Sequence, residues 1–159
     1  MKFIGMLFIL SSAIAFSLER SLLEERRLKT LEELHRFIER TKFEIGCYLR
    51  PISEIAADFH SETLSSLGFF TDLERGGIYS AYLKLESKIS FSEDLQKLFR
   101  RLFSMLGNGY AEDQLKLIEV ASSELSEIIK HERTRVPKQK KLSLTLSCAG
   151  ALALIILLI

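Results

Sequence analysis

The sequence has little of what metal or nucleic-acid chemistry requires. Of its 159 residues two are cysteine, three are histidine and none is tryptophan. Lysine and arginine together number 22 against 21 aspartates and glutamates, which gives a net charge of +1. A chain so close to neutral has neither a basic field for nucleic acid nor an acidic field for cationic partners. We therefore expect no nucleic-acid partner.

The cysteines and histidines form no pattern typical of a metal site or of covalent catalysis. Cys47 falls within an expected helix and Cys148 within an apolar run, so the two form no plausible disulfide pair. The three histidines, His35, His60 and His131, are far apart and lie in no metal-ligand spacing. No CxxC, nucleophile elbow or cysteine–histidine signature is present. We expect no cofactor, no metal and no enzymatic activity, with the histidines solvated or half-buried.

Charge is also missing from both ends of the chain. Residues 3–18 and 142–159 contain no Asp, Glu, Lys or Arg. As a helix the C-terminal run is about 27 Å long, and the hydrocarbon core of a bilayer is about 30 Å thick. The N-terminal run is about 24 Å long, short but tolerable for a span. We interpret the chain as two transmembrane anchors, residues 1–18 and 142–159, around a polar domain of residues 19–141.

The N-terminal run has a second interpretation. Lys2, the short apolar stretch and Ala13-Ile14-Ala15 also fit a secretory signal peptide cleaved after Ala15. Cleavage would place the basic residues that flank the middle domain outside the cell, against the positive-inside rule. With two anchors only Lys2 lies outside. We favour a two-pass protein of the cell membrane with its middle domain in the cytosol, and a secreted or surface-tethered helical binding module is the alternative.

The middle domain has the three- and four-residue apolar spacing of helices and no alternating strand pattern. The charge-rich stretch 19–29 is expected to continue the membrane helix into the first apolar stripe. Pro51 ends that helix and can start the next one. The stripe residues are Leu31, Leu34, Phe37, Ile38, Ile45, Tyr48 and Leu49 in the first helix, then Ile52, Ile55, Ala56 and Phe59 in the second.

Further helices are expected in the second half of the domain. One covers residues 79–89, behind a loop at Gly76-Gly77. The segment Ser90-Phe91-Ser92-Glu93 has capping-box spacing and predicts a helix over about 92–106, stopped by Gly107-Asn108-Gly109. The last cytosolic helix starts near Ala111 and is expected to break or kink at Pro137. The predicted fold is all-α: an antiparallel bundle of about five or six helices, flanked by the two transmembrane helices.

Four short matches, in the expected order along the chain, resemble stage III sporulation protein AB of endospore-forming bacteria. They are Arg27-Leu28-x-x-Leu31-x-x-Leu34; Glu44-Ile45 with Pro51 and Glu54; Leu106-Gly107 with Glu112, Gln114, Lys116 and Ile118; and Lys141-Leu142 with Ala149-Gly150 before the apolar tail. The third match is the most specific, and the resemblance covers nearly the whole chain. Cys47, Arg50 and Tyr110 depart from the family's usual residues, and residues 60–92 match poorly.

The resemblance implies a function that the residues alone do not give. Proteins of this family belong to the mother-cell complex that builds a channel or secretion-like apparatus across the outer forespore membrane. Their cytosolic domain is similar to the F-type platform domains of type II secretion and type IV pilus systems. This similarity implies docking of a cytosolic secretion-type ATPase and anchoring of other channel membrane proteins, without a catalytic residue.

The third match also supplies candidate docking residues. Gly107, Glu112, Gln114 and Lys116 are our candidates for the surface that binds the partner. The alternative for the same residues is a turn followed by the start of the next helix. The bilayer is the other expected partner, through the two anchors.

Overall fold

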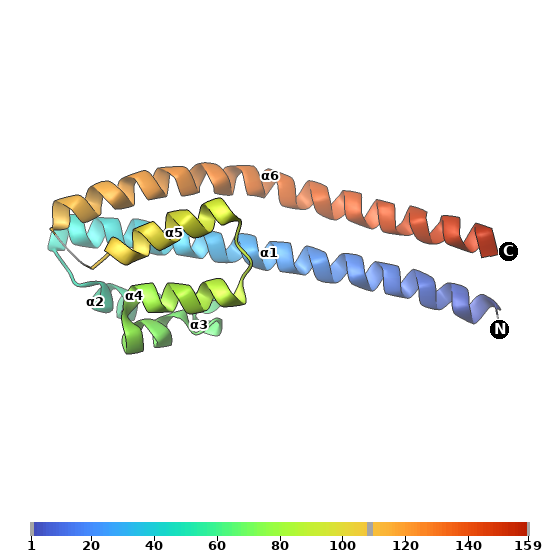
Figure 1. The fold of residues 1–159 in the computed structure, drawn as a ribbon, viewed down its shortest axis with the longest axis horizontal. Helices are drawn as coiled ribbons and strands as arrows, with labels where there is room; N and C mark the ends of the chain where they lie inside the picture. The colour runs from blue at the N-terminus through green and yellow to red at the C-terminus, as the bar shows by residue number, and fades with distance from the viewer. Residues whose placement is uncertain (1, 108–109, 159) are drawn as a thin grey trace. The chain divides into compact units, whose positions relative to one another are not determined.

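The protein is all-α in the computed structural model, which describes residues 2–107 and 110–158 (Figure 1). These residues form six helices and no strand, which confirms the predicted fold class. The helices are α1 (Lys2–Tyr48), α2 (Ile52–Asp58), α3 (Glu62–Ser66), α4 (Phe69–Lys88), α5 (Glu93–Met105) and α6 (Ala111–Leu158). Side chains are described for this range except those of residues 2–10, 13–14, 148, 151–152 and 154–158.

The chain divides into two compact units. Unit 1 consists of Met1–Leu28 with Lys130–Ile159, and unit 2 is Lys29–Ile129. Helices α1 and α6 contribute to both units because each is long. The stretch 19–29 continues the N-terminal helix without interruption, as the sequence predicts.

Unit 1 is an antiparallel pair of helical segments, one from α1 and one from α6. Both termini lie at the same end of this pair (Figure 1). Ser17 Oγ and Ser143 Oγ are 3.0 Å apart across it. Lys140 Nζ donates to Glu25 Oε1 at 2.7 Å, and Arg27 reaches Glu132 at 3.3 Å. These contacts fix the register in which the two segments run.

Helix α6 continues through Pro137, so of the two predicted outcomes, a break or a kink, the break is wrong. A proline inside a helix removes a backbone donor and costs about 3 kcal/mol. In unit 1, contacts with α1 lie on both sides of Pro137: Val136 is buried, Arg135 pairs with Glu24, and Lys140 pairs with Glu25. This packing keeps the segment helical where local preference alone would end it.

Within the described residues, no helix contains a stretch both long and apolar enough to cross a membrane. The two expected spans, 1–18 and 142–159, are helical over residues 2–18 and 142–158. Many of the side chains on which that expectation rests lie outside the described set.

The core of unit 2 forms from the apolar stripes found in the sequence. Helix α4 packs against α2, α3 and α5. Phe37 lies edge-on to Phe59 and Phe69, with ring centroids 5.3 and 5.8 Å away. Tyr82 stacks on Phe103 at 5.1 Å. Each such pair adds about 0.5–1.5 kcal/mol beyond the burial of its surface, so the aromatic clusters make a substantial contribution to the stability of this unit.

The two last members of the first stripe are the exception. Tyr48 is 64% exposed and Leu49 is 74% exposed, so the prediction that they belong to the core is wrong. Helix α1 ends at Tyr48, and Leu49 follows in the left-handed conformation with φ 53°. The Leu49 N–H donates to Ile45 O at 3.2 Å, the single bond of an αL cap that usually has glycine at this position. The turn directs the Leu49 side chain out of the core, and Tyr48 is exposed at the last position of the helix.

Residues 60–92 hold elements that the sequence pattern does not resolve. Helix α3 and the first turns of α4 were not predicted. The expected loop at Gly76-Gly77 is instead a sharp break within α4, where Gly77 has φ 76° and ψ 172°. Lys84 Nζ donates to Asp72 Oδ1 at 2.6 Å across this break, and that hydrogen bond lowers the pKa of Asp72. The salt bridge connects the two halves of α4.

Helix α5 begins close to the predicted place but without the predicted capping box. Its N-cap is Ser92, not Ser90, and the Ser92 side chain makes no capping hydrogen bond. Gln96 Nε2 donates instead to Phe91 O at 3.1 Å. A side-chain cap does occur at Ser61, which accepts the Leu64 N–H at 3.2 Å and starts α3.

We expect Leu49→Gly to stabilise the protein by about 0.5–1 kcal/mol, because a side chain in the αL region costs roughly 1–2 kcal/mol and glycine loses part of this in unfolded-chain entropy. Thermal denaturation of the full chain followed by circular dichroism measures it. Leu49→Ala is the control, since it removes the exposed leucine but keeps the Cβ. Equal shifts for both variants would contradict the backbone explanation.

Candidate functional site

The structure separates the four candidate docking residues into two groups. Gly107 has φ 87°, and its N–H donates to Gln114 Oε1 at 3.1 Å, so this pair ties the end of α5 to the first turns of α6. Glu112 and Lys116 are exposed and line a common groove. Gly107 and Gln114 therefore fit the alternative interpretation, a turn followed by the start of the next helix. The side chains of Glu112 and Lys116 are accessible to a partner.

The groove lies in unit 2, between the C-terminal part of α1 and the N-terminal part of α6. We call it the Phe43 groove. It has a volume of about 700 Å³ and is lined by Glu39, Lys42, Phe43, Gly46, Cys47, Glu112, Leu115, Lys116 and Glu119. The cysteine in it is exposed and free, in the helix where the sequence placed it.

The Phe43 groove combines an exposed aromatic ring with charges of both signs. Phe43 is 52% exposed and contacts the ring of Tyr48 edge-on at 5.9 Å. Lys42 Nζ lies 3.5 Å from Glu119 Oε1, which joins α1 to α6 at the side of the groove. Protein interfaces are enriched in aromatic residues at their centre and polar at their rim. This surface has the composition of a docking site.

A salt-bridge network fixes the end of α1 beside the groove. The Glu44 carboxylate is 4% exposed and binds the guanidinium groups of Arg40 at 2.5 Å and Arg50 at 3.5 Å. Arg50 also reaches Asp58 at 2.7 Å and Glu54 at 3.5 Å, and the hydrogen bond to Asp58 is the main cause of its raised pKa. The second sequence match, which contains Glu44 and Glu54, thus corresponds to the corner between α1 and α2.

A serine–histidine contact also occurs in unit 2. His35 Nε2 lies 3.1 Å from Ser122 Oγ, and the Ser122 hydroxyl donates to the Glu39 carboxylate. In a catalytic triad the carboxylate binds the histidine, and the histidine accepts the proton of the serine. Here Glu39 accepts that proton, so His35 acts as the donor. The arrangement is a bridge between α1 and α6 and lacks an activated nucleophile.

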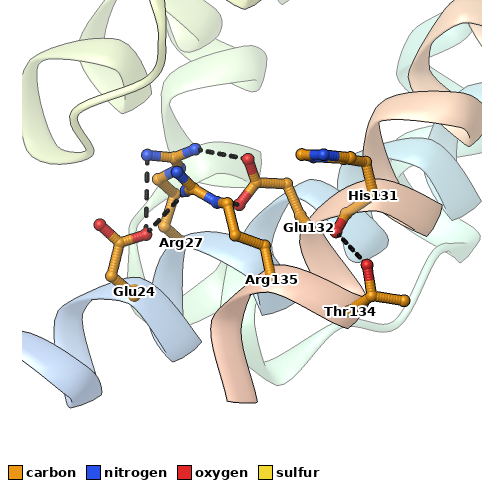
Figure 2. Close-up of polar contacts among 6 residues, drawn as sticks. All are labelled: Glu24, Arg27, His131, Glu132, Thr134 and Arg135. Carbon is orange, nitrogen blue, oxygen red and sulfur yellow. Dashed lines mark hydrogen bonds and ion pairs between the residues drawn. The ribbon is translucent and has the colours of Figure 1, made fainter. Parts of the chain in front are cut away.

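Unit 1 contains a cluster of four ion-paired residues from α1 and α6 (Figure 2). Arg27 lies 3.7 Å from Glu24 and 3.3 Å from Glu132. Arg135 lies 3.5 Å from Glu24 and 2.8 Å from Glu132. Glu132 is buried, and each of its carboxylate oxygens has an arginine partner. Each helix therefore supplies one arginine and one glutamate, which favours a single register of the pair.

Sequence reasoning missed the α1 side of the Phe43 groove, namely Lys42, Phe43 and Gly46. The available signal was the position of Phe43 off the apolar stripe that Leu31, Ile38 and Ile45 define. A large aromatic side chain on the polar face of an amphipathic helix does not belong to the core stripe and so is available to a surface. Among the described residues, no group of three or more potential metal-ligand side chains occurs.

The fold and these contacts define a helical protein built on two long antiparallel helices, with a groove of mixed apolar and charged lining. The family model of stage III sporulation protein AB matches residues 2–159, and the chain belongs to this family. The resemblance inferred from the four sequence matches is thereby confirmed. Comparison with curated protein sequences gives no match, and neither does comparison with solved structures.

We expect Glu44→Gln to destabilise the protein by about 1–2 kcal/mol, because two guanidinium groups lose a charged acceptor that is largely removed from water. The measurement is chemical denaturation of the full chain followed by circular dichroism. The matched control is Glu54→Gln, which removes an exposed partner of Arg50 and should cost less than about 0.5 kcal/mol. If the two variants lose equal stability, the carboxylate of Glu44 does not fix the corner.

Proposed function

We propose that this protein is a non-enzymatic membrane component of the sporulation channel between mother cell and forespore, and that its helical domain docks a cytosolic secretion-type ATPase. Membership of the stage III sporulation protein AB family supports the role in sporulation. The observation that carries the docking proposal is the Phe43 groove, where an exposed aromatic ring lies among lysines and glutamates. Other membrane proteins of the channel are the further partners.

In this proposal residues 1–18 and 142–159 anchor the chain, and residues 19–141 face the mother-cell cytosol from the outer forespore membrane. Two observations support the arrangement. The terminal runs carry no charge, and the segments of α1 and α6 in unit 1 are antiparallel, so both runs extend from the same end of the pair (Figure 1). A two-pass protein with both flanking basic regions in the cytosol has this geometry.

The alternative is a secreted or surface-tethered binding module from which residues 1–15 have been removed. Continuity of α1 through Ala13-Ile14-Ala15 favours the anchor, and so does the contact between Ser17 and Ser143. Ser17 is almost fully buried, although only Phe16 separates it from the cleavage site after Ala15. Removal of residues 1–15 would leave Ser17 next to a new N-terminus. Chain ends are usually poorly ordered, so the contact between Ser17 and Ser143 would be exposed there.

Docking at the Phe43 groove requires a partner surface that is apolar at its centre and charged around it. Glu112, Lys116 and Glu119 lie on the α6 side, while Glu39 and Lys42 lie on the α1 side. Charges of alternating sign give orientation and selectivity more than affinity, and the exposed ring supplies the apolar contact. Gly107 and Gln114 contribute indirectly, since their hydrogen bond holds the first turns of α6.

Deletion of the coding sequence in the source organism, with complementation, tests the role in sporulation. We expect loss of heat-resistant spores with arrest after engulfment and normal vegetative growth. Normal sporulation would overturn the proposed function and leave family membership as a relationship of sequence alone.

Docking is tested by the double substitution Phe43→Ser with Lys116→Glu in the complemented strain. We expect at least about tenfold less ATPase recovered with the affinity-tagged protein, since a central aromatic anchor in an interface contributes 2 kcal/mol or more. The matched control is Leu83→Ser with Arg101→Glu, which likewise replaces one exposed apolar and one basic side chain, but on α4 and α5, outside the groove.

The control variant should recover the ATPase at the level of the unchanged protein. Unchanged recovery with the groove variant would show that the partner docks elsewhere. Circular dichroism of both variants checks that helix content is retained, because a variant that unfolds would lose its partner for another reason.

A further inference from the structure

A second concave site lies in unit 1, between α1 and α6. We call it the Arg20 pocket. It has a volume of about 230 Å³ and is lined by Arg20, Ser21, Glu24, Val136, Gln139, Lys140, Leu142, Ser143 and Leu146. Its lining changes in character along the helices, from charged and polar residues to leucines.

The Arg20 pocket lies where charge ends on both helices. The contact between Ser17 and Ser143 fixes one level of the antiparallel pair. Arg20, three residues from Ser17, and Lys140, three residues from Ser143, are therefore next to each other in the register, and both line the pocket. Beyond the level of Ser17 and Ser143 neither helix carries a charge, except Lys2. The pocket thus straddles a boundary between a charged and an apolar zone.

Apolar side chains are exposed at the same boundary. Leu142 is 71% exposed and Leu146 is 72% exposed, and both line the pocket. Solvent-exposed leucines beside basic residues are unfavourable in water, but the same combination is favourable in the interfacial region of a bilayer. There a lipid presents its phosphate and its acyl chain in that order.

Positive charge is in excess on the α6 side of the pocket, whereas the α1 side also carries Glu24 in the lining. Residues 130–141 contain six lysines and arginines against one glutamate. Arg27, Arg135 and Lys140 are balanced by glutamate partners. Arg20 and Lys138 have no ion pair within the described residues, nor does Lys141. The uncompensated charge favours an anionic ligand over a zwitterionic one.

We propose that the Arg20 pocket binds the headgroup phosphate of an anionic phospholipid, with Leu142 and Leu146 contacting the acyl chain. Arg20, which has no glutamate partner in the described part of the chain, is the main phosphate ligand, and Lys140, which also pairs with Glu25, is the second. The proposal rests on the membrane arrangement put forward under the proposed function. It adds that the two anchors and the basic tract form a lipid-selective site, in addition to setting the topology of the chain.

Native mass spectrometry of the full chain, released in detergent from vesicles of phosphatidylcholine and phosphatidylglycerol in equal amounts, tests the proposal. We expect the unchanged protein to retain phosphatidylglycerol in preference to phosphatidylcholine. In Arg20→Gln with Lys140→Gln, this preference should fall by about fivefold for each side chain removed. Arg20→Lys with Lys140→Arg should restore it, since the charge is kept.

The matched control is Lys138→Gln with Lys141→Gln, which removes the same charge from the same tract but leaves the pocket lining unchanged. This control should lose clearly less of the preference for phosphatidylglycerol than the pocket variant does. Equal loss in both double variants would mean diffuse attraction to an anionic surface and would overturn the site. Absence of any preference in the unchanged protein would overturn it as well.

Two further readouts distinguish failure of the lipid site from failure of the proposed function. Alkaline carbonate washing of the vesicles before release reports whether the chain is embedded, and the same spectra report whether residues 1–15 are present. A chain that is embedded and intact but shows no lipid preference overturns the lipid site alone. A chain that is washed off, or that lacks residues 1–15, overturns the two-anchor arrangement and the lipid site together.

Discussion

The antiparallel pairing of α1 with α6 is the constraint on which the rest of this protein depends. In unit 2 the pairing is fixed by the bridge from His35 through Ser122 to Glu39 and by the contact of Lys42 with Glu119. In unit 1 it is fixed by the arginine–glutamate cluster of Figure 2 and by Lys140 with Glu25. Apolar burial drives such helices together but is not directional, whereas paired polar groups select one register.

Each surface with a proposed role depends on that register. The Phe43 groove needs residues 39–47 of α1 beside residues 112–119 of α6, and the Arg20 pocket needs residues 20–24 beside 136–146. A shift of one helix by a single turn, about 5.4 Å, would separate both sets of lining residues. The polar contacts across the pair therefore determine function through geometry, even though exposed ion pairs add little stability on their own.

The sequence predicted those parts of the fold in which periodicity decides the outcome. Leu31, Leu34, Leu95, Leu102 and Leu125 repeat at helical spacing and are buried. It failed where a tertiary contact outweighs local preference, as at Pro137, and where backbone conformation outweighs pattern, as at Leu49. Two residues of the proposed docking surface, Glu112 and Lys116, followed from the third match of the family resemblance, which is local in sequence. The other side of that surface lies some seventy positions earlier on α1, and no local spacing connects the two.

Two pairs of exposed apolar side chains lie at or beside the two concave surfaces. In a bundle stabilised by its core, Phe43, Tyr48, Leu142 and Leu146 would be replaced by polar residues at no cost to stability, since each is more than half exposed. They occur in two groups, each beside charged residues that line the same concave surface. Phe43 and Tyr48 lie among charges of both signs, as apolar residues do in protein interfaces. Leu142 and Leu146 follow a tract with an excess of positive charge, the pattern expected at the face of an anionic bilayer. The difference in charge pattern, more than the apolar residues themselves, is the basis on which we propose a protein partner for one surface and a lipid for the other.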